Sequence, residues 1–209
     1  MSEVAFSDLQ QDAITELVNL GIGRAADALS QMVSEEILLS VPEIVFTNAR
    51  DLQERLNTTY KAAPAVISQC FSGDFSGNAL LVIPDDSVSP LVEKMLRNTS
   101  VGEEVETYTE DALLEIGNIV LNACFGQLGD LLSTQLDSGL PEKIGLNLST
   151  LFNDDKTEPV DYLMQVMLLQ VDFSMSLEKS NGFVVFIMSV ASMQNFKQKI
   201  DSYLVSLFN

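Results

Sequence analysis

Two stretches of this sequence repeat one another: residues 12–33 read DAITELVNLGIGRAADALSQMV, and residues 111–132 read DALLEIGNIVLNACFGQLGDLL. Polar and proline positions recur in one register, because each residue of the second copy is numbered 99 higher than its counterpart. The matched pairs are Asp12 and Asp111, Glu16 and Glu115, Asn19 and Asn118, and Pro42 and Pro141. Identities held in one register within an apolar framework indicate an internal duplication.

Both stretches have the apolar spacing of a long amphipathic helix. At about 100° of turn per residue, the Asp, Glu and Asn of each copy share one face. The opposite, apolar face comprises Ile14, Leu17, Gly21, Ala25, Ala28 and Met32 in the first copy, and Leu113, Ile116, Val120, Cys124 and Leu131 in the second. Asn122 joins the polar face of the second helix, at a position where the first copy has Gly23.

Strand-like sequence follows each predicted helix. We expect strands at 37–46, 65–71, 78–83, 143–151, 164–173 and 182–190, a polar connection at 174–181, short helices near 87–96 and 192–207, and a polar linker at 98–106. Pro42 and Pro141 are expected at a strand start or a sheet edge, where a missing N–H costs nothing. The sequence therefore predicts an α/β (α+β) fold with two long helices on one face of a six-stranded β-sheet. Residues 1–209 are expected to form a single domain of two tandem repeats, at about 8–97 and 107–209.

Composition excludes several classes of function. The net charge is −19, with 11 Lys and Arg against 30 Asp and Glu, so binding to nucleic acid or to an anionic membrane is not expected. The longest apolar runs are shorter than the roughly 20 residues of a membrane-spanning helix. The chain has no His, which removes the usual general base and zinc ligand.

The two cysteines, Cys70 and Cys124, form no close-spaced pair and lie in apolar segments. Reduced core thiols in a cytoplasmic protein are therefore expected, rather than a disulfide or a metal site. The N-terminus has no basic region followed by an apolar one, so we expect no secretion signal.

The spacing Asp-x3-Glu-x2-Asn-x22-Pro, present twice, resembles the signature of the CheC, CheX and FliY phosphatases of bacterial chemotaxis. Two motifs in a chain of this length look like CheC, whereas CheX carries one motif in a shorter chain that dimerises and FliY carries a further domain. The resemblance implies an internally duplicated, pseudo-twofold CheC-like fold and a monomer. It also implies a partner, a phosphorylated CheY-like receiver, with the CheD deamidase as a possible second partner.

The resemblance implies that the chain stimulates hydrolysis of the receiver's aspartyl phosphate. Asn19 and Asn118 would orient the attacking water without adding negative charge, and Glu16 and Glu115 would pair with a lysine of the receiver. No cofactor or metal of its own is expected, because the Mg²⁺ belongs to the receiver. Three further residues have supporting roles. Asp12 and Asp111 contact the partner at the rim or, as we favour, stabilise the helix N-terminus; Asn122 bonds Glu115 or the partner, or is solvated.

The first copy departs from the family pattern. Val18 stands where a small residue is usual, whereas the second copy keeps Gly117 there, and Arg24 replaces a small polar residue. We expect Val18 to alter how closely a partner approaches, which leaves the second site the less disturbed one.

Other functions remain open at this point. The chain could be a non-catalytic adaptor for phosphorylated receivers or for CheD, although an adaptor has no need of an Asn that orients water. It could be a component of the flagellar switch. A metalloenzyme built on the paired carboxylates is disfavoured, because each helix offers two carboxylates and an amide without His.

Overall fold

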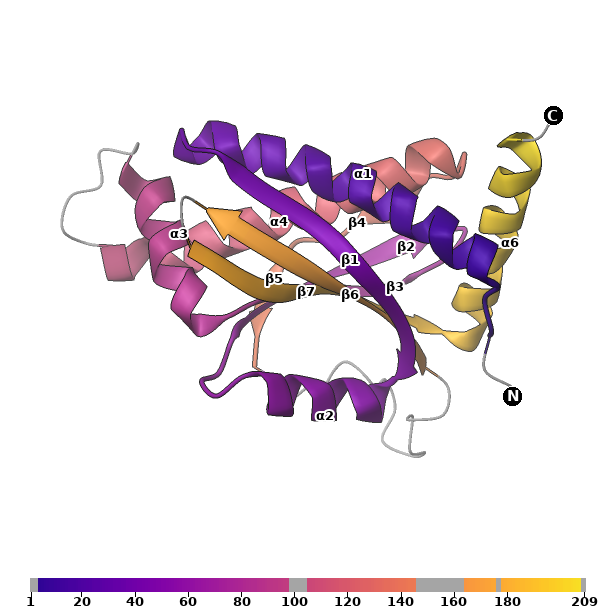
Figure 1. Ribbon diagram of the computed structural model, residues 1–209, viewed down its shortest axis with the longest axis horizontal. Helices are drawn as coiled ribbons and strands as arrows, with labels where there is room; N and C mark the ends of the chain where they lie inside the picture. The colour runs from indigo at the N-terminus through magenta and orange to yellow at the C-terminus, as the bar shows by residue number, and fades with distance from the viewer. Residues whose placement is uncertain (1–3, 98–104, 146–163, 176–177, 208–209) are drawn as a thin grey trace.

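Two long helices lie over one face of a β-sheet and carry both copies of the repeated motif (Figure 1). Helix α1 (Asp8–Val33) begins at a capping box, in which Ser7 and Gln10 each bond the backbone N–H of the other, and ends at Ser34 in the left-handed conformation. Helix α4 (Val105–Leu131) is its counterpart in the second copy. The computed structural model describes residues 4–97, 105–145, 164–175 and 178–207.

In these described residues the sheet has seven strands in the order β1-β6-β7-β3-β2-β4, and β5 also pairs with β2. All of these pairs are antiparallel. The strands are β1 (Ile37–Asn48), β2 (Ala65–Gly73), β3 (Gly77–Ile83), β4 (Leu136–Ser138), β5 (Glu142–Ile144), β6 (Met164–Met175) and β7 (Glu178–Ser189).

The strand order follows the sequence repeat. Each half contributes a strand directly after its long helix and then a hairpin, and that first strand pairs with the hairpin of the other half: β1 pairs with β6, while β4 and β5 pair with β2. The two hairpins meet at the centre of the sheet, where β3 pairs with β7. The halves are therefore interleaved through the sheet, and α1 and α4 pack against each other above it.

The larger hydrophobic core lies between the sheet and four helices, α1, α4, α3 (Asp85–Arg97) and α6 (Val190–Leu207). The predicted inward positions are mostly buried, but Ala28 is exposed and that prediction is wrong. The neighbouring Leu29 is 1% exposed and occupies the core instead. The two side chains are one residue apart on the helix, and the larger apolar one takes the inward place.

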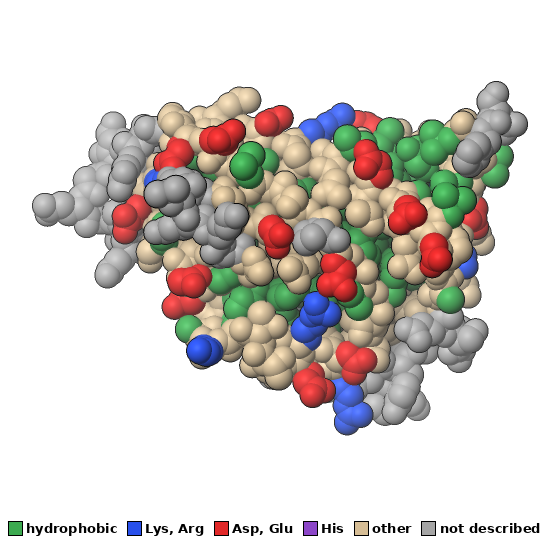
Figure 2. All heavy atoms as spheres, viewed as in Figure 1, with side chains coloured by type: hydrophobic (Ala, Val, Ile, Leu, Met, Phe, Trp, Pro, Cys, Tyr) green, Lys and Arg blue, Asp and Glu red, His purple; other side chains and the backbone are tan. Residues whose placement is uncertain are grey.

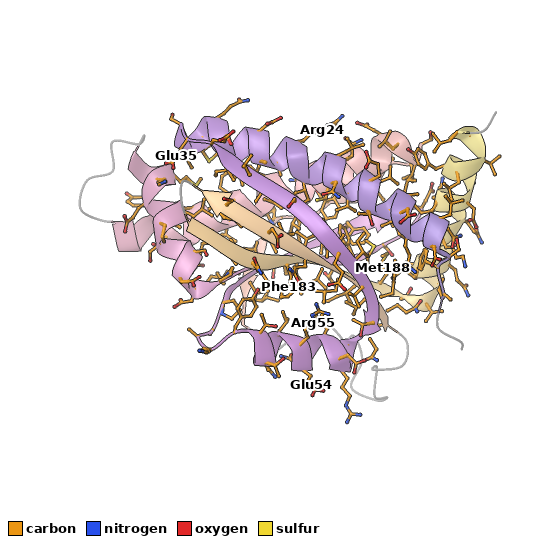
Figure 3. The ribbon with its side chains drawn as sticks, in the orientation of Figure 1. Arg24, Glu35, Glu54, Arg55, Phe183 and Met188 are labelled. Carbon is orange, nitrogen blue, oxygen red and sulfur yellow. The ribbon has the colours of Figure 1, made fainter. Side chains whose placement is uncertain are left out.

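Helix α2 (Ala49–Thr59) was not expected from the sequence, and it covers the opposite face of the sheet (Figure 1). Its buried residues Ala49, Leu52 and Leu56 pack on a second core cluster that includes Phe183. Arg55 lies under the sheet, with its guanidinium carbon 5.8 Å from the centre of the Phe183 ring (Figure 3). The prediction of helices on one face alone is therefore incomplete, because an 11-residue helix with only three buried residues gives a weak periodic signal.

Most predicted strands are confirmed, with changes at their ends, but the predicted number of six is wrong, because the described part of the sheet has seven strands and β4 was not expected. The polar connection predicted at 174–181 is largely strand, because Ser174 pairs with Lys179 and Met175 with Glu178 as the β6–β7 hairpin extends. The strand predicted at 143–151 is described only as far as residue 145, and most of the predicted linker at 98–106 also lies outside the described residues. Residues 105 and 106 already belong to α4.

Within the described residues, one segment, Tyr108–Leu131 of α4, is long and apolar enough to cross a membrane by length and composition. The same segment is a core helix here, with 56% of its most apolar window buried inside the fold. Its apolar character is therefore accounted for by packing on the sheet and on α1.

Candidate functional site

The four repeated acids lie on the exposed side of the two long helices. Asp12, Glu16, Asp111 and Glu115 are all exposed, and among the described residues none of them has a hydrogen bond or ion pair. Acidic side chains are spread over the face seen in Figure 2, where basic side chains are few. Each Glu is thus a free carboxylate that can pair with a cation of a partner.

Asp12 and Asp111 lie in the second turn of their helices, because α1 begins at Asp8 and α4 at Val105. The interaction of a charge with the helix dipole falls off within the first turn. The favoured explanation, support of the helix N-terminus, therefore does not account for these residues. Contact with a partner stays a prediction for both.

Asn19 is held by the neighbouring edge strand. Its Oδ1 accepts a hydrogen bond from the backbone N–H of Val41 at 2.9 Å, and its Nδ2 donates to the Val41 carbonyl oxygen at 3.3 Å. The side chain is half-buried, and Val41 is 3% exposed. One carboxamide thus satisfies both polar groups of a buried backbone unit.

The register of β1 explains why Val41 needs this partner. Ser40 pairs with Asp172 and Glu43 with Gln170, so Val41 and Pro42 together oppose the single residue Val171. This is a β-bulge, in which the extra residue is left out of the ladder and a proline is tolerated. The prediction of Pro42 at a sheet edge is confirmed, since β1 is the terminal strand of the sheet.

Asn118 makes a different contact. Its Oδ1 accepts a hydrogen bond of 2.6 Å from Nδ2 of Asn122, one helical turn further along α4. Among the described residues no group bonds to Asn118 Nδ2. The first copy has Gly23 at the position of Asn122, so Asn19 has no such neighbour.

Asn122 is itself fixed by two residues that the sequence did not single out. Gln69 of β2 donates to Asn122 Oδ1 at 3.2 Å, and Ser138 of β4 donates to the same atom at 2.8 Å. Of the roles considered for Asn122, the described structure shows neither a bond to Glu115 nor a fully solvated side chain. The sequence did contain one signal for this contact: Gln69 stands among the apolar residues of a predicted strand, and a buried amide requires hydrogen-bond partners.

The residue directly before the Asn of the motif is buried in both copies. Val18 is fully buried, so the expectation that it alters the approach of a partner is wrong. Gly117 packs on β2, where a Cβ atom would lie 2.4 Å from Cγ2 of Ile67. The difference between Val18 and Gly117 therefore lies inside the fold and not on the exposed surface.

The helices α1 and α4 come close at Gly21, where a Cβ atom would lie 3.0 Å from Cα of Cys124. Arg24, on the outer side of α1 in Figure 3, pairs with Asp130 of α4 at 3.4 Å. Both partners are well exposed, so this ion pair contributes little to stability. In the part of the chain that the structure describes, no group of three or more Asp, Glu, Cys or His side chains could hold a metal ion.

Comparison with known proteins finds relatives that share the motif region and the fold of this chain. The model of the CheC-like family matches residues 9–46, which contain the first motif through Pro42. The CheY-P phosphatase CheC of Bacillus subtilis is 26% identical over 141 residues, and the flagellar motor switch phosphatase FliY of the same organism is 20% identical over 162 residues. In sequence and fold the chain resembles the CheC, CheX and FliY proteins.

Solved structures share the fold of this chain. FliY of Thermotoga maritima superposes with a TM-score of 0.72 at 18% identity, covering 97% of this chain and 99% of that one. CheX in the CheX–CheY–BeF3–Mg complex of Borrelia burgdorferi gives a TM-score of 0.50 at 15% identity, covering 81% and 96%. The predicted CheC-like fold is thereby confirmed.

The sequence matches cover only part of the relatives. The aligned regions span 65% of B. subtilis CheC and 42% of B. subtilis FliY, less than two thirds of either protein. FliM from Helicobacter pylori, solved with SpeE, has the same fold at a TM-score of 0.68 and 10% identity. Since this fold occurs in differently named proteins, function has to be argued from the site.

Proposed function

We propose that this protein is a phosphatase that stimulates hydrolysis of the aspartyl phosphate of a phosphorylated CheY-like receiver, a cytoplasmic partner. The observation that carries the proposal is the pair Glu115 and Asn118, in which an exposed, unpaired carboxylate lies one helical turn from an amide whose Nδ2 is free among the described residues. The names of the relatives support the same reaction, since CheC is described as a CheY-P phosphatase and FliY as a switch phosphatase.

The chemistry requires little more than placement. A water oxygen attacks phosphorus in line with the aspartyl oxygen, the bond between phosphorus and that oxygen breaks, and the receiver recovers its carboxylate as inorganic phosphate leaves. The proton of the attacking water passes to the phosphate or to solvent. Catalysis of such a loose transition state rests on positioning and on electrostatic stabilisation.

The residues suit these tasks by their charge. Asn118 supplies a neutral donor for the water, where a carboxylate would repel the anionic phosphoryl group. Glu115 pairs with the lysine of the receiver and sets the orientation of the two proteins. The Mg²⁺ belongs to the receiver. Glu16 and Asn19 form the corresponding pair of the first copy, although Asn19 has to leave Val41 before both of its polar atoms are available.

A second candidate function is a structural role in the flagellar switch, which the name of the relative FliY, a flagellar motor switch phosphatase, favours. A structural subunit needs contact surfaces, but it does not need an amide placed beside an unpaired carboxylate in each half. The two functions differ in one measurable property, the lifetime of the phosphorylated receiver.

The test measures phosphate release from a phosphorylated CheY-like receiver with and without this protein at substoichiometric concentration. A phosphatase turns over, so each molecule should release many phosphates. A switch subunit or an adaptor would leave the lifetime of the receiver unchanged, or would change it only in proportion to the complex formed. Either of these results would overturn the proposed function.

A further inference from the structure

Gln69 is a polar side chain buried in the sheet beneath the second copy of the motif. It is 1% exposed, and its Nε2 donates both to Asn122 Oδ1 at 3.2 Å and to the Gly139 carbonyl at 2.9 Å. Its Oε1 has no partner in the described structure. Burial of an amide with an unsatisfied oxygen costs free energy, which the two hydrogen bonds donated by Nε2 offset in part.

The contacts continue from Gln69 to the candidate catalytic amide. Asn122 receives bonds from Gln69 and Ser138 on its oxygen and donates its own Nδ2 to Asn118 Oδ1. A carboxamide whose oxygen accepts from two donors can present only its NH₂ group to the next residue. Asn118 must then offer Oδ1 to Asn122, which leaves Nδ2 for another partner.

The first copy lacks this chain of contacts. In the first copy the bulge of β1 lies opposite Val171, an apolar residue that cannot donate a side-chain hydrogen bond. Gly23 stands at the position that corresponds to Asn122. Asn19 has turned instead to the backbone of Val41, with both polar atoms engaged. In the second copy, the backbone between β4 and β5 has other partners. The N–H of Gly139 donates to the Cys70 carbonyl and its carbonyl accepts from Gln69, and neither group bonds Asn118.

We propose that Gln69 and Asn122 are positioning residues for Asn118, and that they make the second copy the principal phosphatase site. This inference rests on the proposed function. Gln69 belongs to the first half of the chain and Asn118 to the second, so the working site is built from both halves through the interleaved sheet. The amide is oriented before the receiver binds, which removes the cost of ordering it in the transition state.

The test uses two changes that remove these contacts, of which Gln69→Met also preserves side-chain volume. Gln69→Met keeps the length of a buried, unbranched side chain and removes its donor, and Asn122→Ala removes the intermediate amide from a half-buried helix position. Each variant should lower kcat for phosphate release by about 10- to 100-fold, with KM changed by less than about twofold, because misplacement acts on the transition state.

Gln165→Met is the matched control, since Gln165 is also a buried glutamine of the sheet, 6% exposed, and among the described residues no hydrogen bond joins it to Asn118 or Asn122. Its kcat should stay at the wild-type value. Thermal unfolding of all three variants separates lost catalysis from lost folding. If Gln69→Met fails to fold, Asn122→Ala alone decides the question.

A double-mutant measurement distinguishes positioning of Asn118 by Asn122 from a purely structural role of Asn122. Asn118→Ala combined with Asn122→Ala should be no slower than Asn118→Ala alone, because Asn122 acts only through Asn118. If the wild-type protein releases phosphate and Asn118→Ala does not, while Gln69→Met and Asn122→Ala keep wild-type kcat, the positioning role is overturned and the proposed function stands. If the wild-type protein releases no phosphate, the proposed function itself has failed.

Discussion

The carboxamide of Asn19 and the backbone of Val41 form a closed pair of hydrogen bonds, 2.9 Å from the Val41 N–H and 3.3 Å to its carbonyl oxygen. This pair joins α1 to the bulge of β1, whereas the equivalent Asn118 is joined to a residue of its own helix. One residue type therefore stabilises the fold in the first copy and is left with a free donor in the second.

Replacement of Asn19 should consequently affect stability more than replacement of Asn118. Asn19→Ala leaves the N–H and C=O of a buried residue without partners, at a cost of about 1–3 kcal/mol in the free energy of unfolding. Asn118→Ala should cost less than about 1 kcal/mol, because only a half-exposed bond between side chains is lost. Urea unfolding of the two variants checks this, and equal losses would argue against a special role of the Asn19–Val41 pair.

Gly21 and Gly23 provide a matched pair on α1. A Cβ atom at Gly21 would lie 3.0 Å from Cys124 Cα and 3.2 Å from the Ala123 carbonyl oxygen, whereas one at Gly23 meets nothing within 4 Å. Gly21→Ala should destabilise the protein by about 1–3 kcal/mol, because the added methyl group crowds the backbone of α4. The higher helix propensity of Ala offsets part of this loss. Gly23→Ala should stabilise it by up to about 1 kcal/mol. Similar melting temperatures for both variants would contradict the close approach of α1 and α4.

Charge reversal at Glu115 tests the contact with the receiver. Glu115→Lys should raise KM for the phosphorylated receiver by about 10-fold or more, because an attraction to lysine becomes a repulsion. The control is Glu54→Lys, which makes the same change in net charge on α2, beneath the opposite face of the sheet (Figure 3). If both variants change KM equally, the effect comes from overall charge rather than from this site.

The two thiols should differ in reactivity. Cys70 is exposed, whereas Cys124 is buried, and desolvation raises the pKa of its thiol to about 12. At pH 8 the folded protein should therefore react with a thiol reagent at one cysteine, and the second should react only as the protein unfolds, because the thiolate is the nucleophile. The number of reactive thiols before and after denaturation checks this. Rapid reaction of both in the native protein would show that α4 is not packed as described.

The repeated helices could be predicted from the sequence because their signal is long, periodic and present twice. The same holds for the exposed face carrying Asp12, Glu16, Asp111 and Glu115, since helical spacing alone places these residues together. Short helices and strands have too few buried residues to show a clear hydrophobic period in the sequence. Helix α2 buries only three residues, although Asn48 at its N-cap and the spacing of Leu52 and Leu56 were visible in the sequence.

The partners of the two Asn residues could not be predicted. The bond from Asn19 to Val41 depends on a bulge in the pairing of β1 with β6, two strands separated by more than 100 residues. The contact of Gln69 with Asn122 depends on how closely α4 approaches β2 at Gly117. Helical periodicity shows which face a residue occupies, but the register of a distant strand decides what that residue meets.

The central claim is that Asn118 acts on the attacking water rather than on binding. Its most direct test pairs the single-turnover rate of phosphate loss at saturating protein with the affinity for the receiver carrying beryllium fluoride and Mg²⁺. For Asn118→Ala the rate should fall about 100-fold or more towards that of the receiver alone, while the affinity stays within about threefold of wild type. A wild-type rate with Asn118→Ala, or a loss of rate explained entirely by lost affinity, would contradict the claim.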